Sequence, residues 1–107
     1  MASILDLPLA DIPALCRRYR VRRLELFGSA TTDAFDPQRS DLDFLVAFDA
    51  NPPDLFSRYF GLKESLEALF GRDVDLVMIG AMQNPYFIES VNKTRQLVYA
   101  AEDAQAA

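Results

Sequence analysis

The chain has 107 residues, of which 50% are hydrophobic and 25% charged, and this composition is typical of a folded domain. Its formal net charge of −5 disfavours a long nucleic acid as partner, because there is no overall basic field to release counterions. With one cysteine and no histidine, disulfide frameworks, Cys/His zinc sites and histidine-dependent triads are excluded, which leaves carboxylates, hydroxyls, lysine, arginine and a bound hard cation.

The N-terminal part predicts a helix rather than a leader. Over residues 8–20, apolar side chains recur at three- and four-residue spacing, which indicates an amphipathic helix. The segment before Arg17 contains Asp6 and Asp11 and no basic leader with a cleavage site, and no apolar run reaches the length of a membrane span. We therefore expect a cytoplasmic protein with no membrane partner.

Two extended segments follow. Residues 22–27 alternate, with Leu24 and Leu26 on one face and polar side chains on the other, which predicts a half-buried strand that ends at Gly28. The polar segment 29–40 has room for a short helical turn over residues 31–35. Residues 41–48 then resume the extended pattern, in which the even-numbered side chains form a continuous apolar face.

The second half predicts two helices and two strands. A helix is expected from Leu55 to Phe70, with Gly71 as its C-cap, and a strand over residues 73–79. Asn84 is placed to cap a further helix, and residues 96–99 suggest a last short strand. The length predicts one domain over residues 1–107, with a frayed tail from about residue 101.

Carboxylates stand out inside the predicted strands. Asp41 and Asp43 project from one face, with backbone positions about 6.6 Å apart. If the strand of residues 73–79 pairs beside theirs, Asp75 joins them. Oxygen ligands of this kind suit magnesium, and three carboxylates could hold two metals that stabilise the attacking and leaving oxygens of an in-line displacement.

A Gly-Ser turn precedes these carboxylates. Gly28 lets the backbone approach a ligand closely, and Ser29 adds a hydroxyl donor next to amides that could bind phosphate. Each piece alone has a simpler explanation, since a Gly-Ser pair is usually an ordinary turn and an Asp-x-Asp pair is usually a solvated sheet face or an edge-strand device. The joint arrangement favours phosphate transfer.

The segments LFGS (26–29), SDLDFLV (40–46) and VDLV (74–77) resemble the DNA polymerase beta-type nucleotidyltransferase superfamily, most closely its minimal bacterial members. The resemblance implies an α/β (α+β) fold with a small mixed β-sheet flanked by helices. It also implies transfer of a nucleoside monophosphate from ATP or another nucleoside triphosphate. In that reaction Gly28 and Ser29 hold the triphosphate, Asp41 and Asp43 bind Mg²⁺, and Asp75 completes the metal site and helps to activate the acceptor hydroxyl.

The chain departs from the family pattern at two places. Eleven residues separate Ser29 from Asp41, one more than is usual, and Ala30 stands where many minimal members have arginine. A one-residue insertion can be absorbed in a bulging connection. The loss of a cation near the triphosphate is expected to weaken nucleotide binding.

The resemblance further implies a partner. Minimal members are often antitoxins encoded beside a HEPN-type toxin, and some transfer AMP to a tyrosine of that toxin. The leading hypothesis is therefore a magnesium-dependent enzyme that moves AMP onto a partner protein. One alternative is a catalytically weak or inactive antitoxin that masks its partner. Another, adenylylation of a small molecule, is disfavoured because so short a chain has no additional substrate-binding domain.

Overall fold

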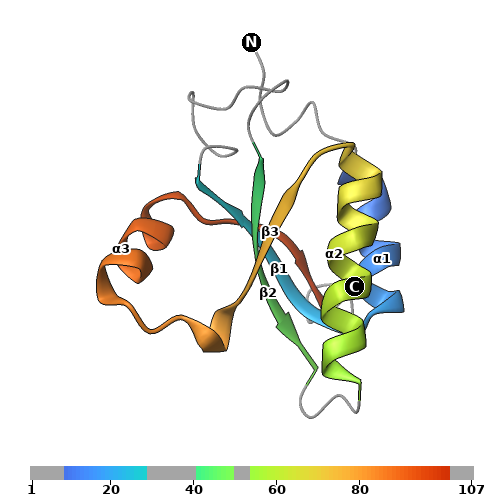
Figure 1. Cartoon of the computed structure of the whole chain (residues 1–107), viewed down its shortest axis with the longest axis horizontal. Coiled ribbons are helices and arrows are strands. Elements are labelled where there is room, and N and C mark those ends of the chain that lie inside the picture. The colour runs from blue at the N-terminus through green and yellow to red at the C-terminus, as the bar shows by residue number, and fades with distance from the viewer. Residues whose placement is uncertain (1–8, 29–40, 50–53, 102–107) are drawn as a thin grey trace.

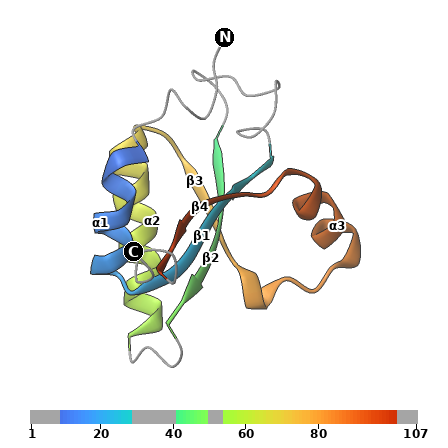
Figure 2. The same ribbon diagram turned by 180° about the vertical axis from the view of Figure 1, so that it is seen from behind.

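A computed structural model of the chain describes residues 9–28, 41–49 and 54–101 (Figures 1 and 2). These residues form one four-stranded mixed sheet in the order β3-β2-β1-β4. Central strand β1 pairs antiparallel with both β2 and β4, whereas β2 and β3 are parallel. The strands are β1 (Val21–Phe27), β2 (Leu42–Phe48), β3 (Val74–Met78) and β4 (Gln96–Ala100).

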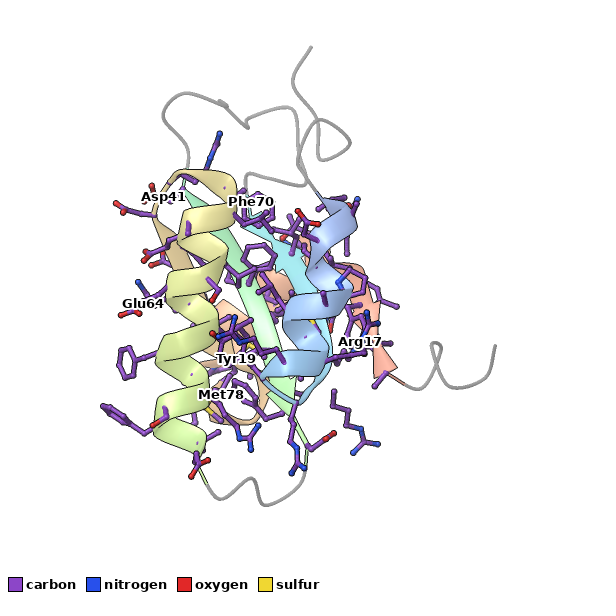
Figure 3. All side chains as sticks on the ribbon, turned by 90° about the vertical axis from the view of Figure 1, so that its right-hand side faces the viewer. Arg17, Tyr19, Asp41, Glu64, Phe70 and Met78 are labelled. Atoms are coloured by element: carbon purple, nitrogen blue, oxygen red, sulfur yellow. The ribbon has the colours of Figure 1, made fainter. Side chains whose placement is uncertain are left out.

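Helices cover the two faces of the sheet unequally. Helices α1 (Ile12–Arg18) and α2 (Leu55–Phe70) lie side by side on one face, and α3 (Pro85–Thr94) stands on the other (Figures 1 and 2). Tyr19, just after α1, reaches across to α2, where its hydroxyl oxygen is 3.0 Å from that of Ser65 (Figure 3). The predicted mixed α+β fold is confirmed. No described helix combines the length and the apolar character needed to cross a membrane.

The main core lies between β1, β2 and the helices α1 and α2. Leu24, Leu42, Phe44 and Leu66 are fully buried there. A smaller apolar cluster lies on the opposite face, where Leu45 packs with Phe27 and Val91. Because α3 supplies Val91, the face that carries the Asp-x-Asp aspartates is closed over its middle and open at its two ends.

Most predicted elements are present, with altered ends. The first helix is shorter than residues 8–20, since Leu9–Asp11 form a 3-10 turn (η2) and Arg20 has a positive φ of 58°, which a right-handed helix cannot contain. Strand β2 begins at Leu42, so Asp41 precedes it. The turn expected over residues 31–35 and the tail from residue 102 lie outside the described residues.

The polar face of the first strand is more buried than its alternation predicts. Glu25 was expected on the open side of a half-buried strand, and its residue exposure is 3%. The reason is tertiary, because Arg95, between α3 and β4, covers it and bonds to both of its carboxylate oxygens. A period-two pattern reports which face a residue lies on but not what later covers that face.

Helix α2 ends at Gly71, which adopts the left-handed conformation with φ 66°. We expect Gly71→Ala to lower the free energy of unfolding by about 1 kcal/mol, because an L side chain is strained at this φ although no atom blocks the space. Urea unfolding will measure the change. Gly80→Ala is the matched control, since Gly80 is equally open and has no such φ. Equal losses in both variants would contradict the conformational explanation.

Candidate functional site

Two aspartates meet where β2 and β3 begin. Asp43 and Asp75 are directly paired in the parallel register of these strands, so their side chains leave the same face of the sheet. Their carboxyl groups are close enough to share a hydrogen bond. The condition set by the sequence, that the strand of Asp75 pairs beside the Asp-x-Asp strand, is therefore met, and the structure shows that this pairing is parallel.

The environment of Asp43 penalises negative charge. Burial raises the pKa of Asp43 from 3.8 to about 6, with further contributions from the hydrogen bond to Asp75 and from the negative charges of Asp75 and Asp41. At neutral pH Asp43 is thus ionised in a place where its charge is poorly compensated. A bound cation would supply the missing compensation.

Gly28 supports Asp43 from the neighbouring strand end. It has a positive φ of 76°, and a Cβ atom there would lie 2.6 Å from the Oδ2 atom of Asp43. Its amide donates a 2.8 Å hydrogen bond to the Oγ1 atom of Thr94. The described structure therefore shows Gly28 as the residue that leaves room for the Asp43 carboxylate, with its amide engaged by Thr94.

The other residues predicted for the site are Ser29 and Asp41. Ser29 and residues 30–40 lie outside the described residues. Asp41 is exposed just before β2, near enough for its charge to act on Asp43. Within the described ranges, no three Asp, Glu, Cys or His side chains are arranged as a ready metal site. The structure thus brings together the pair Asp43 and Asp75, with Asp41 beside it.

A cavity of about 370 Å³ opens next to the pair, and α2 contributes Lys63 and Tyr59 to its lining. The Nζ atom of Lys63 is 2.9 Å from the Oε2 atom of Glu67, and the same oxygen accepts a 3.1 Å hydrogen bond from the amide of Val74. Glu67 therefore connects Lys63 to the start of β3. The bond to Glu67 raises the pKa of Lys63, and this charged side chain lines the same cavity as Asp43 and Asp75.

Aromatic side chains complete the cavity wall. Phe27 and Phe87 meet edge to face, with ring centroids 5.9 Å apart, and the Tyr59 hydroxyl donates to the carbonyl of Leu76. Sequence reasoning missed Lys63, Tyr59 and Phe87 as residues of this site. Lys63 and Glu67 have the i,i+4 spacing of an ordinary surface ion pair, so only the fold reveals that Lys63 lines the same cavity as the aspartates.

The donor set fits a hard divalent cation. Magnesium is commonly held by one or two carboxylates together with waters and substrate phosphates, and it does not require a dedicated cage of protein ligands. Asp43 and Asp75 offer carboxylate oxygens, and burial, with the neighbouring carboxylates, raises the pKa of Asp43. Such an arrangement can bind a metal-bound polyphosphate in the adjoining cavity.

A family model for the nucleotidyltransferase domain matches residues 12–98 of the chain. The chain belongs to this family. It is 36% identical over 99 residues to a Methanocaldococcus jannaschii protein that is provisionally named a protein adenylyltransferase, and the match covers 92% of this chain and 96% of that relative. The protein is a nucleotidyltransferase, as its sequence predicts.

Solved structures agree with this nucleotidyltransferase fold. One, described provisionally as a minimal nucleotidyltransferase, has 30% sequence identity and a TM-score of 0.68, with 89% of this chain and 95% of that chain covered. Another is a Shewanella oneidensis complex of a tri-AMPylated HEPN toxin with an MNT antitoxin, at 18% identity and a TM-score of 0.59, covering 92% of this chain and 74% of that chain. At that identity the second likeness shows the fold alone.

Proposed function

We propose that this nucleotidyltransferase moves AMP from ATP onto a hydroxyl of a partner protein, with Mg²⁺, as the antitoxin of a pair with a HEPN-type toxin. The observation that carries the proposal is the Asp43–Asp75 pair, whose uncompensated charge borders a cavity that also contains Lys63. The protein adenylyltransferase name of the relative supports the donor and the acceptor class. The complex of an AMPylated toxin with an MNT antitoxin supports the kind of partner.

The positions of the chain's own groups support the following proposed roles. Asp43, with Asp41 beside it, would hold the cation, and Asp75 would complete the metal site; a bound cation would supply positive charge for the phosphates of the nucleotide. Asp75 is more exposed than Asp43 and orients the acceptor hydroxyl, whose proton passes to its carboxylate. The acceptor oxygen forms a bond to the α-phosphorus while the bond to the β-phosphate oxygen breaks, and pyrophosphate leaves. Gly28 and Ser29 are proposed to hold the triphosphate.

Lys63 is proposed to hold the phosphates in place of the arginine that is absent at position 30. We expect Lys63→Gln to raise the KM for ATP about tenfold with a smaller change in kcat, because an ammonium that contacts phosphates outside the bond that breaks contributes mainly to binding. Steady-state kinetics at varied ATP concentration will measure both constants.

Lys93→Gln is the matched control for this lysine. Lys93 forms the same i,i+4 pair with Glu89, at 3.7 Å, on exposed α3. Lys63→Arg should recover most of the affinity, since it restores the charge. If Lys63→Gln and Lys93→Gln change the KM for ATP equally, the phosphate role of Lys63 is wrong.

A second candidate function is a masking antitoxin that neutralises its partner without catalysis. Large apolar side chains available for docking favour it, since Phe56 is 77% exposed and Tyr86 is 82% exposed. The effects of two variants on neutralisation of the partner distinguish the two functions. Masking predicts that Phe56→Ser abolishes neutralisation while Asp43→Asn preserves it, and catalysis predicts that Asp43→Asn abolishes it.

The proposed function is tested by incubating the purified chain with ATP labelled on the α-phosphate, Mg²⁺ and the protein encoded next to it. We expect label on the partner and its loss with EDTA. ATP labelled on the γ-phosphate should leave no label, because that phosphate departs with pyrophosphate. Label from the γ-phosphate, or α-label transfer that survives Asp41→Asn combined with Asp43→Asn, would overturn the assignment.

A further inference from the structure

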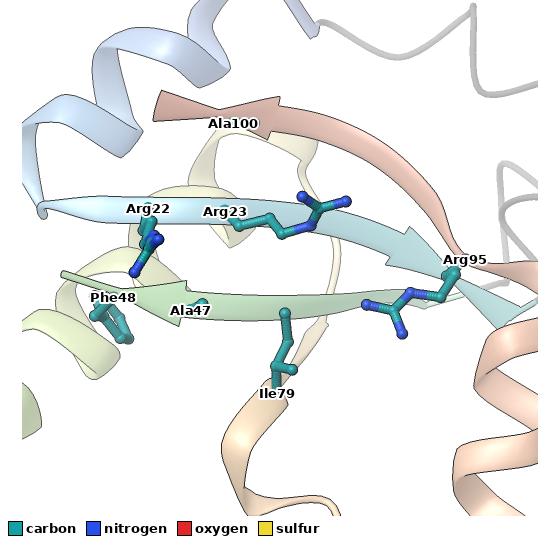
Figure 4. Close-up of a pocket in the computed structure, with 7 residues that line it drawn as sticks. All are labelled: Arg22, Arg23, Ala47, Phe48, Ile79, Arg95 and Ala100. Carbon is teal, nitrogen blue, oxygen red and sulfur yellow. The ribbon is translucent and has the colours of Figure 1, made fainter. Parts of the chain in front are cut away.

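A second cavity, of about 360 Å³, lies at the opposite end of the sheet face that carries Asp43. Three of its seven lining residues are arginines, namely Arg22, Arg23 and Arg95 (Figure 4). The chain as a whole is acidic, with 16 acidic and 11 basic residues. The cavity therefore gathers positively charged guanidinium groups, although the net charge of the chain is negative.

A β-bulge places two consecutive arginines on this one face. In the pairing of β1 with β2, Val21 is opposite Phe48 and Arg23 is opposite Ala47, so Arg22 is an extra residue in β1. Val21 and Leu24 consequently both point into the core, while the two residues between them both line the cavity. Bulges of this kind re-aim side chains and are frequent next to binding sites.

The third arginine comes from the other end of the chain and is rigidly held. Arg95 donates from Nε and Nη2 to the two carboxylate oxygens of Glu25, at 2.9 and 2.6 Å, and from Nη1 to Asn92 at 2.8 Å. Glu25 also accepts from the Nε atom of Arg23 at 3.0 Å. In Figure 4, Arg23 and Arg95 extend toward one another across the cavity. The buried Glu25 thus fixes the orientation of both guanidinium groups.

This arrangement leaves donors directed at the cavity. The hydrogen bond of Arg23 to Glu25 uses Nε, and among the described residues nothing bonds to its two terminal Nη groups, which form a fork on a side chain that is 44% exposed. Arginine forks match the oxygens of phosphate, and Phe48 and Ile79 add apolar surface beside them. The volume falls in the range of small-molecule sites, roughly 300–1,000 Å³.

We propose that this arginine cavity is a second binding site, for a small phosphate-bearing molecule with an apolar portion. The site lies apart from the catalytic cavity, because fully buried Leu45 and Val91 from α3 fill the sheet face between them. The arginine cavity has no lining residue in common with the catalytic one. Occupation of this site therefore does not require Asp43, Asp75 or a bound metal.

The test adds AMP or inorganic phosphate to the chain in EDTA. Binding of each probe is measured by changes in the NMR signals of the arginine Nε–H groups. We expect saturable shifts of the Arg23 and Arg95 signals with both probes, and tighter binding of AMP because the face of its aromatic base can pack against Phe48. The shifts should persist in Asp43→Asn, which removes a catalytic carboxylate. Failure of transfer activity would leave this result unaffected, so the two proposals fail independently.

Two variants test the assignment to this cavity. Arg23→Gln should weaken AMP binding about tenfold. Arg18→Gln, which removes the same charge from an exposed position of α1, should leave AMP binding unchanged. Ala47→Leu should also weaken binding by filling the cavity without removing a charge, and thermal melts will confirm that it is folded. Equal effects of Arg23→Gln and Arg18→Gln, or no saturable shift at Arg23 and Arg95, would overturn the proposal. So would shifts there with oligoglutamate but not with AMP, which would assign the site to an acidic protein segment.

Discussion

Asp43→Asn is expected to reduce nucleotidyl transfer at least about 100-fold while making the metal-free protein more stable. The two effects have one cause. Burial, together with the neighbouring charges of Asp75 and Asp41, makes ionisation of Asp43 unfavourable in the folded chain, and the pKa is about 6. Asparagine removes that charge and with it the ligand that the cation needs. A residue retained at a cost to stability is typical of a functional site.

The sign of the stability change follows from proton binding. Unfolded Asp43 has a pKa near 3.8, and the folded value is about 6, so between these values the folded state holds more protons than the unfolded state. The contribution of Asp43 to the free energy of unfolding is fully present below about pH 4 and is lost as the pH rises through 6. At pH 7.5 the substitution should therefore raise the free energy of unfolding by up to about 3 kcal/mol.

Thermal and urea unfolding of both proteins in EDTA at pH 4.5 and 7.5 will measure the difference, which should shrink at the lower pH. Mg²⁺ should stabilise the native protein and have less effect on Asp43→Asn. Asp49→Asn, an exposed aspartate after the other end of β2, is the matched control for both activity and stability. If Asp43→Asn loses transfer activity but is no more stable than Asp49→Asn at pH 7.5, ionised Asp43 does not destabilise the folded protein.

Arg95→Ala is expected to lower the free energy of unfolding by about 3 kcal/mol, because it leaves the buried Glu25 carboxylate with a single partner, Arg23. Two charge-assisted hydrogen bonds from Arg95 are lost at once. Most of the lost stability comes from leaving the buried Glu25 carboxylate without the hydrogen bonds that offset its charge. Urea unfolding at pH 7.5 will measure it.

The pH dependence of this variant identifies the mechanism. The hydrogen bond from Arg95 is the largest influence that lowers the pKa of Glu25, so the stabilisation is present above the unfolded pKa and is lost as the pH falls through the folded value. The difference between native protein and Arg95→Ala should therefore narrow in acid. Adding Glu25→Gln to Arg95→Ala should recover part of the loss. Arg18→Ala, at an exposed arginine over the Tyr19 ring, is the control, and a loss as large as that of Arg95→Ala would refute the buried-charge explanation.

Several features of this protein followed from local sequence. The alternation around Leu24 and Phe44, the Gly71 cap and the Asn84 cap are each decided by a few neighbouring residues, and the structure contains the predicted strands and caps. Period-two alternation placed Asp41 and Asp43 on one strand face, and Asp75 was expected to join them if its strand paired beside theirs, as it does. Ser29 and the triphosphate contacts assigned to it remain predictions.

Other features depended on contacts between residues far apart in the chain. Glu25 looks like a solvated strand residue until Arg95, 70 positions later, is folded onto it. Lys63 looks like half of a surface ion pair until the fold places it on the wall of the cavity that Asp75 also lines. Periodicity encodes the face on which a side chain lies, and this much the sequence by itself determined. What covers that face, and therefore which charges are buried together, was decided by the tertiary structure, because burial and charge pairing depend on strand order and on where α3 packs.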